Sequence, residues 1–348
     1  MRVLNAAVLK EANGTLEIFK SIETPPLKDY QVLVKIYFSG VCRSQVMEVD
    51  GCRGTDVWLP HMLGHEASGK VVAVGSKVEK LSVGDLVVAT WIQSAGGDSG
   101  GCNYSYRGQT INSGSITTFS NYSIISENRL VKLDPRVPLD LAVTLGCAVP
   151  TGAGLIYNEI GNKKDKSIVI FGLGGIGLSA LLAARNFEFS KIIVVDIDEK
   201  KLSLARKIGA HSVINASSVN PVKAIIEATV DGADYCIDAS GICSVIEQAF
   251  SSSKPATGIT IFASHPPYGE KLSIDPHDLI KGRKIFGSWG GASEPDRDVE
   301  MYSRLYLEGR FDLSVLIDKI YKFEEINLAI SDLRAGKCLR PVIQMDEH

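Results

Sequence analysis

The chain lacks several features on which whole classes of protein depend. It has no excess of positive charge, because its 348 residues carry a net charge of −3 and the pI is near 6.1. We therefore expect no nucleic-acid partner and no anionic membrane surface, since both select basic proteins. The seven cysteines are odd in number and scattered along the sequence. This pattern argues against a disulfide framework.

Long apolar runs are also missing. The apolar run near the start of the sequence is too short for a secretory signal. The uncharged and largely apolar stretch at residues 168–184 has its glycines clustered together. It divides better into a buried strand, a tight turn and a helix than into a membrane span. We therefore expect a cytoplasmic protein.

The length of the chain suits two domains. Residues 32–36, 69–74 and 86–89 have strand composition, which predicts a β-rich first part. The pattern changes near Thr151, where short apolar runs begin to alternate with helical segments; the runs are 168–171, 192–195, 212–214, 235–237 and 259–262. This alternation predicts an α/β region with a doubly wound parallel sheet. It fades after Phe286, where we expect a helix around 299–308 and a strand at 341–345.

A glycine-rich turn follows the first of these apolar runs. Gly172, Gly174 and Gly177 form the pattern G-x-G-x-x-G between a strand and a helix, the context that a dinucleotide site requires. In such a turn the glycines allow a tight bend, a close approach to pyrophosphate and close helix packing. Asp196 ends the next strand, 19 residues after Gly177, and would accept hydrogen bonds from the adenosine ribose. No arginine follows it directly, so the sequence predicts NAD rather than NADP.

Three separate segments offer ligands for a metal. Cys42, His65 and Cys147 each lie close to a glycine. Two thiols and one imidazole suit zinc, and three protein ligands leave the fourth position open, as in a catalytic site. A buried, inert cysteine is the alternative for either thiol taken alone.

These segments together resemble the zinc-containing alcohol dehydrogenases of the medium-chain dehydrogenase/reductase superfamily. GVCRS, GHEASG, LGCAVPTGAG, GLGGIGLS, VVDIDEKK and CLRPVI appear in family order over essentially the whole chain. The resemblance implies a GroES-like catalytic domain, residues 1–149 and 286–348, and a Rossmann domain, residues 150–285, inserted between its two parts. It also implies one catalytic zinc, held by Cys42, His65 and Cys147, and NAD.

The resemblance implies further roles. Ser44 matches a hydroxyl that contacts the substrate oxygen, and Glu66 lies beside the zinc ligands. The remaining matches are to NAD-binding residues: Arg43, Thr151, Gly172, Gly174, Gly175, Ile176, Gly177, Asp196, Lys201 and Arg340. Trp58 and Trp91 fall in segments that line the substrate channel of relatives, which would favour a bulky or sugar-like alcohol. For the residues outside the glycine turn a structural role remains the alternative. Ser44 would then be a turn serine, Glu66 a hydrogen-bonded buried carboxylate and Lys201 a solvated helix lysine. Arg43 and Arg340 would form surface ion pairs, and the other residues would be ordinary packing residues: Thr151, Ile176, Trp58 and Trp91.

The sequence departs from the family pattern in three places. The lobe that holds a second, structural zinc in many relatives corresponds to residues 91–108 and contains one cysteine, Cys102. One thiol cannot close a tetrahedral site, so we expect a single zinc per chain and a mobile Gly/Ser-rich loop. Met47 stands where a histidine usually ends the proton relay, and Gln45 stands where an acidic residue often orients the metal-bound histidine. His265 is a candidate to contact the substrate or take its proton; a structural histidine before a proline turn is the alternative.

The sequence thus predicts an NAD-dependent zinc alcohol dehydrogenase. Two other hypotheses remain: a zinc-free quinone or enone reductase of the same superfamily, and a non-catalytic nucleotide-binding protein. The intact set of Cys42, His65 and Cys147 argues against both. In relatives the segment matching residues 283–288 pairs across a dimer axis, so we expect a homodimer, with a tetramer as the alternative.

Overall fold

A computed structural model describes residues 3–345 of the chain. The chain divides into two compact units: one runs to Cys147 and resumes at Glu294, and the other is Ala148–Ser293. Residues 286–293 belong with the second unit because Lys284–Gly287 is a strand of its sheet and the Ser293 hydroxyl donates to the Pro150 carbonyl at 2.9 Å. The second unit therefore extends beyond residue 285.

The first unit is built from two β structures. A closed barrel contains β1 (Val3–Leu9), β2 (Glu17–Glu23), β7 (Asn103–Tyr106), β8 (Gln109–Asn112) and β4 (His61–Met62). A seven-stranded sheet follows the order β10 (Leu130–Lys132), β6 (Leu86–Thr90), β5 (Glu66–Val74), β3 (Gln31–Gly40), β18 (Pro341–Gln344) and β17 (Lys319–Lys322), with β9 (Tyr122–Ser126) also paired to β3. The strands predicted at 32–36, 69–74, 86–89 and 341–345 lie in this sheet.

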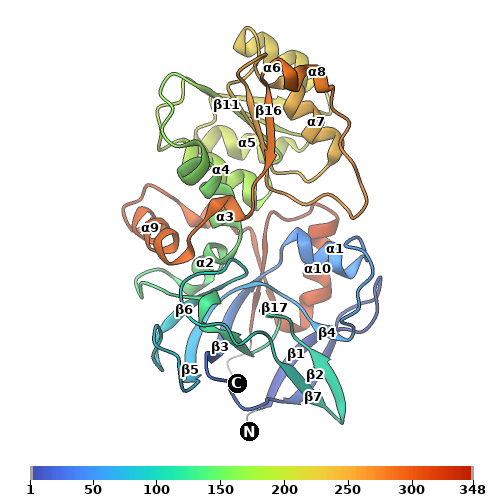
Figure 1. The fold of residues 1–348 in the computed structure, drawn as a ribbon, viewed down its shortest axis with the longest axis vertical. Helices are drawn as coiled ribbons and strands as arrows, with labels where there is room; N and C mark the ends of the chain where they lie inside the picture. The colour runs from blue at the N-terminus through green and yellow to red at the C-terminus, as the bar shows by residue number, and fades with distance from the viewer. Residues whose placement is uncertain (1–2, 346–348) are drawn as a thin grey trace. The chain divides into compact units, whose positions relative to one another are not determined.

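The pairing of β18 with β3 brings the two ends of the sequence together. The strands are antiparallel, with Val342 opposite Gly40, and the Val41 amide donates to the Pro341 carbonyl at 2.9 Å. In Figure 1 the red β17 and the blue β3 accordingly belong to the same unit. This register places Arg340 next to the segment that carries Cys42.

Four α-helices complete the first unit: α1 (Arg43–Val49), α2 (Leu139–Ala142), α9 (Pro295–Leu307) and α10 (Ile326–Arg334). The helix predicted around 299–308 corresponds to α9. Short 3-10 helices lie at Glu127–Arg129, Val143–Gly146, Leu313–Leu316 and Phe323–Glu325. The core beneath the sheet contains Val34, Ile36, Ala67, Val87 and Ile343.

The second unit contains a six-stranded, wholly parallel sheet. Its order is β13 (Ser212–Asn215), β12 (Lys191–Asp196), β11 (Ser167–Phe171), β14 (Tyr235–Asp238), β15 (Ile259–Phe262) and β16 (Lys284–Gly287). In chain order this is 3-2-1-4-5-6, the order of a doubly wound dinucleotide-binding sheet. All five residues of β11 are buried, which accounts for the uninterrupted apolar run from Ile168 to Phe171. The predicted α/β fold is confirmed.

Helices connect these parallel strands. The connecting helices are α4 (Gly175–Ala184), α5 (Glu199–Ile208), α6 (Pro221–Thr229), α7 (Cys243–Ser252) and α8 (Pro276–Ile280). Before the first strand lies α3 (Ala148–Gly154), which continues as a π-helix over Leu155–Ile160. Asp198 begins α5 by accepting a hydrogen bond from the Lys200 amide, and Gly209 ends it at a φ of 124°. No single helix among the described residues is long and apolar enough to cross a membrane. The bent pair Leu139–Gly146 and Ala148–Ile160 reaches the length and composition of a membrane span only when its two helices are counted together.

Candidate functional site

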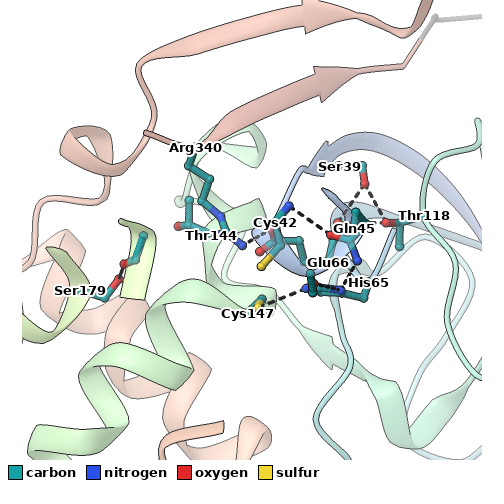
Figure 2. A network of polar contacts seen from close by, with 12 residues as sticks. Ser39, Cys42, Gln45, His65, Glu66, Thr118, Thr144, Cys147, Ser179 and Arg340 are labelled. Carbon is teal, nitrogen blue, oxygen red and sulfur yellow. Dashed lines mark hydrogen bonds and ion pairs between the residues drawn. The ribbon is translucent and has the colours of Figure 1, made fainter. Parts of the chain in front are cut away.

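The three predicted metal ligands lie together in the first unit. Cys42 is the residue before α1, His65 precedes β5, and Cys147 follows the 3-10 helix Val143–Gly146. Their ligand atoms all lie within 4.8 Å of one another, and the His65 Nε2 is 3.2 Å from the Cys147 Sγ (Figure 2). Ligand atoms of a tetrahedral zinc site lie roughly 3.5 Å apart, so this cluster fits zinc. It is the one such cluster of metal-ligating side chains found in residues 3–345.

Glu66 fills the space that two glycines leave beside these ligands. A Cβ atom on Gly146 would lie 2.8 Å from the Glu66 Cβ, and one on Gly40 would overlap the Glu66 carboxylate. The hydroxyls of Ser39 and Thr118 donate to the Glu66 carbonyl at 3.0 and 3.2 Å. Gly40 is therefore required by the buried Glu66 carboxylate, whereas Gly146 is required by the Ala89 carbonyl and the base of the Glu66 side chain.

The Glu66 carboxylate forms an ion pair with Arg340. Both side chains are buried, at 0% and 5% exposure, and an Arg340 guanidinium NH₂ group donates to Glu66 Oε1. Burial alone would lower the pKa of Arg340, but the charges of Glu66, Cys42 and Cys147 and the hydrogen bond to Glu66 together outweigh burial and raise that pKa. The Asp318 carboxylate accepts the Leu339 and Arg340 amides at 2.7 and 3.3 Å, which fixes the strand that carries the guanidinium. Sequence reasoning assigned Arg340 to pyrophosphate and missed this contact.

Gln45 lies between the two ligand segments. Its amide oxygen accepts the Cys42 amide at 3.1 Å, and its amide nitrogen contacts His65 Nδ1. Coordination through Nε2 requires the proton on Nδ1, and this proton needs an acceptor. Rotating the Gln45 amide by 180° would supply an oxygen to this proton but would turn its NH₂ group toward the Cys42 amide, so the Gln45 side chain can satisfy only one of the two groups through its oxygen. The Ser44 hydroxyl lies 3.4 Å from His65 Nδ1.

The two ligand thiols differ in acidity. A hydrogen bond from the Cys147 thiol, with further contributions from His65 and Arg340, places the pKa of Cys42 well below its usual value. The same hydrogen bond and burial raise the pKa of Cys147 well above its own. Cysteine binds zinc as the thiolate, so both thiols would be deprotonated with the metal bound.

The glycine-rich turn lies at the carboxyl end of β11 in the second unit. Gly174 precedes α4 without a side-chain cap, and a Cβ atom there would meet nothing within 4 Å. A Cβ atom on Gly177 would overlap the Gly172 carbonyl, so α4 packs directly on the turn. The amides that begin α4, at Gly175 and Ile176, are available to an anion with open space above the backbone.

Asp196 ends β12 beside this turn. Its Oδ2 accepts the Leu173 amide at 2.6 Å, and its Oδ1 accepts the Ile197 and Asp198 amides at 2.8 and 2.9 Å. The carboxylate is therefore held against the glycine-rich turn. Lys201 lies half-buried on α5, and Arg43 is exposed in the first turn of α1.

Thr151 and Ile176 come from adjacent helices of the second unit. A Cβ atom on Gly152 would overlap the Ile176 carbonyl, so α3 and α4 are in close contact there. Thr151 is 3% exposed, and its hydroxyl has no hydrogen-bond partner within the described part of the chain. A buried hydroxyl without a protein partner can form a hydrogen bond with a polar ligand.

Aromatic side chains occur in both units. In the first, Trp58 is 68% exposed and Trp91 is half-buried, with its carbonyl accepting a hydrogen bond from Arg129. In the second, exposed His265 meets Trp289 edge-on, with ring centroids 5.9 Å apart. Sequence reasoning missed Trp289. The available signal was its position after β16, since ligands bind outside the carboxyl ends of parallel strands.

The segment 91–108 carries no metal cluster within the described chain. Its one thiol, Cys102, is buried and lies 3.8 Å from the Ser113 hydroxyl. Instead of lying free, the loop is hydrogen-bonded to Glu127, Asn128 and Asp296. These bonds favour an ordered loop over the mobile one expected from its composition.

Comparisons with known proteins agree with this architecture. Residues 28–135 match the alcohol dehydrogenase GroES-like domain, and residues 175–305 match the zinc-binding dehydrogenase family. The chain is 29% identical to S-(hydroxymethyl)glutathione dehydrogenase of Saccharomyces cerevisiae, covering 98% of this chain and 96% of that protein.

Two solved structures are similar over nearly their whole length. One is an alcohol dehydrogenase zinc-binding domain protein from Burkholderia ambifaria, with a TM-score of 0.92, 29% identity, and coverage of 99% and 100% of the two chains. The other is benzyl alcohol dehydrogenase from Acinetobacter calcoaceticus, with a TM-score of 0.90, 31% identity and the same coverage. The chain therefore belongs to the zinc-type alcohol dehydrogenases of the medium-chain dehydrogenase/reductase superfamily, which are NAD-dependent, zinc-binding alcohol oxidoreductases.

Proposed function

We propose that this chain oxidises an alcohol to an aldehyde or ketone with one zinc bound by Cys42, His65 and Cys147. The observation that carries the proposal is the distance of at most 4.8 Å between the three ligand atoms in a buried setting. When bound, zinc supplies a Lewis acid that lowers the pKa of an alcohol oxygen, and NAD supplies the hydride acceptor. The protein's residues orient these groups and move the proton.

Ser44 is the proposed first acceptor of the alcohol proton. Its hydroxyl lies 3.4 Å from His65 Nδ1, next to the ligand cluster, and a hydroxyl can accept one proton while passing on another. Met47, on the buried side of α1, cannot continue this relay because a thioether has no exchangeable proton. Beyond Ser44 the proton would have to leave through the ribose of bound NAD and water, or through another base.

NAD binding is assigned to the glycine-rich turn and its neighbours. The amides of Gly175 and Ile176 are proposed to bind the pyrophosphate, and Asp196 the adenosine ribose. The Thr151 hydroxyl is proposed to contact the nicotinamide side. The other members of the proposed cofactor site are Gly172, Gly174, Gly177, Lys201, Arg43 and Arg340. Arg340 already pairs with Glu66, and its several donors leave others for a second anion.

The substrate is proposed to be a bulky, partly apolar alcohol. Trp58 and Trp91 are the pocket candidates of the first unit, and the exposed pair His265 and Trp289 is the candidate of the second. Aromatic faces favour a ring or another broad apolar group. The similarity to a benzyl alcohol dehydrogenase supports an arylmethanol as the first substrate to test.

His265 is proposed to contact this substrate or to take its proton. Replacing His265 with alanine would then change the pH–rate profile or the ratio of kcat/KM between benzyl alcohol and 1-butanol. An unchanged profile together with an unchanged ratio would leave His265 as a structural residue.

A homodimer in the cytoplasm is proposed on separate grounds. β16 is an edge strand of the parallel sheet; Phe286 within it and Ile280 at the end of the preceding α8 are 44% and 81% exposed. An edge strand with exposed apolar neighbours can pair with a second copy. The seven cysteines are all free of disulfides, which suits a reducing compartment.

Metal analysis with an alcohol panel tests the central proposal. Wild-type protein should hold about one zinc per chain and reduce NAD with at least one alcohol of the panel. Cys42→Ala should lose both the zinc and more than about 99% of the turnover. Cys52→Ala is the matched control, because this half-buried thiol lies outside the ligand cluster. Zinc well below one per chain in the wild type, or turnover that survives Cys42→Ala, would overturn the proposal.

A further inference from the structure

Residues 91–102, here called the 91–102 loop, have a sequence that favours disorder. Four of the twelve residues are glycines, and Ser94, Asp98 and Ser99 add short polar side chains. Glycine loses more backbone entropy on ordering than any other residue. A fixed conformation therefore requires contacts from outside the loop.

Glu127 provides the first of these contacts. Its carboxylate is buried at 2% exposure; Oε1 accepts the Gly97 amide at 2.9 Å, and Oε2 accepts the Glu79 and Lys80 amides at 3.2 Å each. It forms no ion pair with any residue that the structure describes. Peptide N–H groups alone thus stabilise its negative charge, and their hydrogen bonds link the loop to residues 79–80 through the Glu127 carboxylate.

Lys80 and Asp296 provide the second contact. The Lys80 ammonium donates to Ser94 Oγ at 2.7 Å, the Ala95 carbonyl at 2.9 Å and Asp296 Oδ1 at 2.8 Å. Asp296 Oδ2 in turn accepts the Ala95 amide at 3.0 Å. Lys80 therefore binds Glu127 through its backbone and the loop through its side chain.

The glycines of the loop fit these contacts. Gly96 has a φ of 110°, and a Cβ atom on it would lie 2.7 Å from the Glu127 Cγ. A Cβ atom on Gly97 would overlap the ring of Tyr30. Glycine at these two positions is needed for the close approach of the loop to Glu127, which gives the composition a structural reason other than mobility.

We propose that Glu127, Lys80 and Asp296 form a clamp, the Glu127 clamp, that holds the 91–102 loop in one conformation without a metal. A tetrahedral metal site would order such a loop through four side-chain ligands. Here two carboxylates and one ammonium group hold the 91–102 loop through hydrogen bonds to its peptide groups. The order of the loop therefore depends on charge and hydrogen bonds, and it survives removal of zinc from the protein. This inference does not rest on the proposed catalytic roles.

Hydrogen exchange of the whole protein, measured on peptides by mass spectrometry, tests the clamp. Glu127→Gln keeps the size of the side chain but replaces one acceptor oxygen with an N–H₂ group facing a backbone donor. We expect exchange of the loop amides to rise about tenfold or more in Glu127→Gln and in Lys80→Met. Residues 167–171 of the second unit should exchange at the wild-type rate in both variants.

Glu79→Gln is the matched control, because Glu79 contributes only its backbone amide, and it should leave loop exchange within about twofold of the wild type. Treatment of the wild type with 1,10-phenanthroline should remove zinc and leave loop exchange unchanged. Unchanged loop exchange in the folded Glu127→Gln and Lys80→Met variants would overturn the clamp. A chelator effect as large as that of either substitution would overturn it as well. Should Glu127→Gln fail to fold, Lys80→Met decides alone.

Discussion

The Arg340 guanidinium and the Glu66 carboxylate form a buried ion pair across 274 positions of sequence. The pair exists because β18 lies antiparallel to β3, so that the residue before β18 meets the segment leading to Cys42. Gly40 leaves the space that the carboxylate occupies. The ligand cluster is thus packed around a charged pair that itself depends on both ends of the chain.

Removing one partner of this pair should destabilise the protein strongly. Arg340→Met or Glu66→Leu leaves an uncompensated buried charge, which costs about 3–5 kcal/mol. The double variant Glu66→Leu/Arg340→Met should be more stable than either single variant, because neither charge remains. Urea unfolding followed by tryptophan fluorescence measures all three. Lys10→Met, which breaks the exposed pair with Glu17, should cost less than about 1 kcal/mol. If Arg340→Met and Glu66→Leu each lowered the free energy of unfolding by less than about 1 kcal/mol, the buried ion pair would be contradicted.

Substitution of Ser44 should slow the reaction without removing the metal. Ser44→Ala deletes the proposed proton acceptor, and the loss of one general acid–base group lowers kcat by about 10²–10⁴-fold. The zinc content should stay at the wild-type level because the hydroxyl is not a ligand. Ser44→Thr keeps the hydroxyl and should recover most of the rate. A slow Ser44→Ala that has also lost its zinc would instead indicate a role in holding His65.

Asp196 should decide the choice between NAD and NADP. Its carboxylate accepts three backbone amides beside the glycine-rich turn, and it would repel a 2′-phosphate. Asp196→Asn should reduce kcat/KM with NAD by roughly tenfold to a hundredfold, since hydrogen bonds to charged groups contribute about 1.5–3 kcal/mol. Activity with NADP should rise relative to NAD. Asp198→Asn, which alters the nearby cap of α5, serves as the control. An unchanged cofactor ratio in Asp196→Asn would count against the ribose contact.

Acid should weaken the second unit through Asp234. Burial would raise its pKa, but hydrogen bonds from the Ser167 amide and hydroxyl and from Lys166 outweigh burial and lower it below the model-peptide value of 3.8. A lowered folded-state pKa means that the carboxylate stabilises the fold above the unfolded-state pKa and loses this effect as pH falls toward the folded-state pKa.

The thermal midpoint of Asp234→Asn should therefore lie below that of the wild type at pH 7, and the difference should shrink as pH falls from about 5 to 3. Asp231→Asn, at an exposed carboxylate, should show a small and pH-independent difference. A difference between Asp234→Asn and the wild type that stays constant from pH 7 to pH 3 would contradict the assigned cause.

The sequence by itself determined the elements and the chemical type of the site. The uninterrupted apolar run of β11, the glycines after it and Asp196 after β12 are local patterns, and local patterns carry strand, turn and helix identity. The thiol and imidazole side chains likewise indicate zinc before any contact between them is known. Strands at 32–36, 69–74 and 86–89 followed from residue types that suit a buried, pleated surface.

Tertiary structure alone decided which side chains meet. The partner of Glu66 could not be read from the sequence, because it depends on the register of β18 against β3, and strand register is a long-range property. The 91–102 loop was expected to be mobile because glycine and serine favour disorder. Its bonds to Glu127, Lys80 and Asp296 come from three distant segments, and only the folded chain brings their charges within reach of the loop's peptide groups.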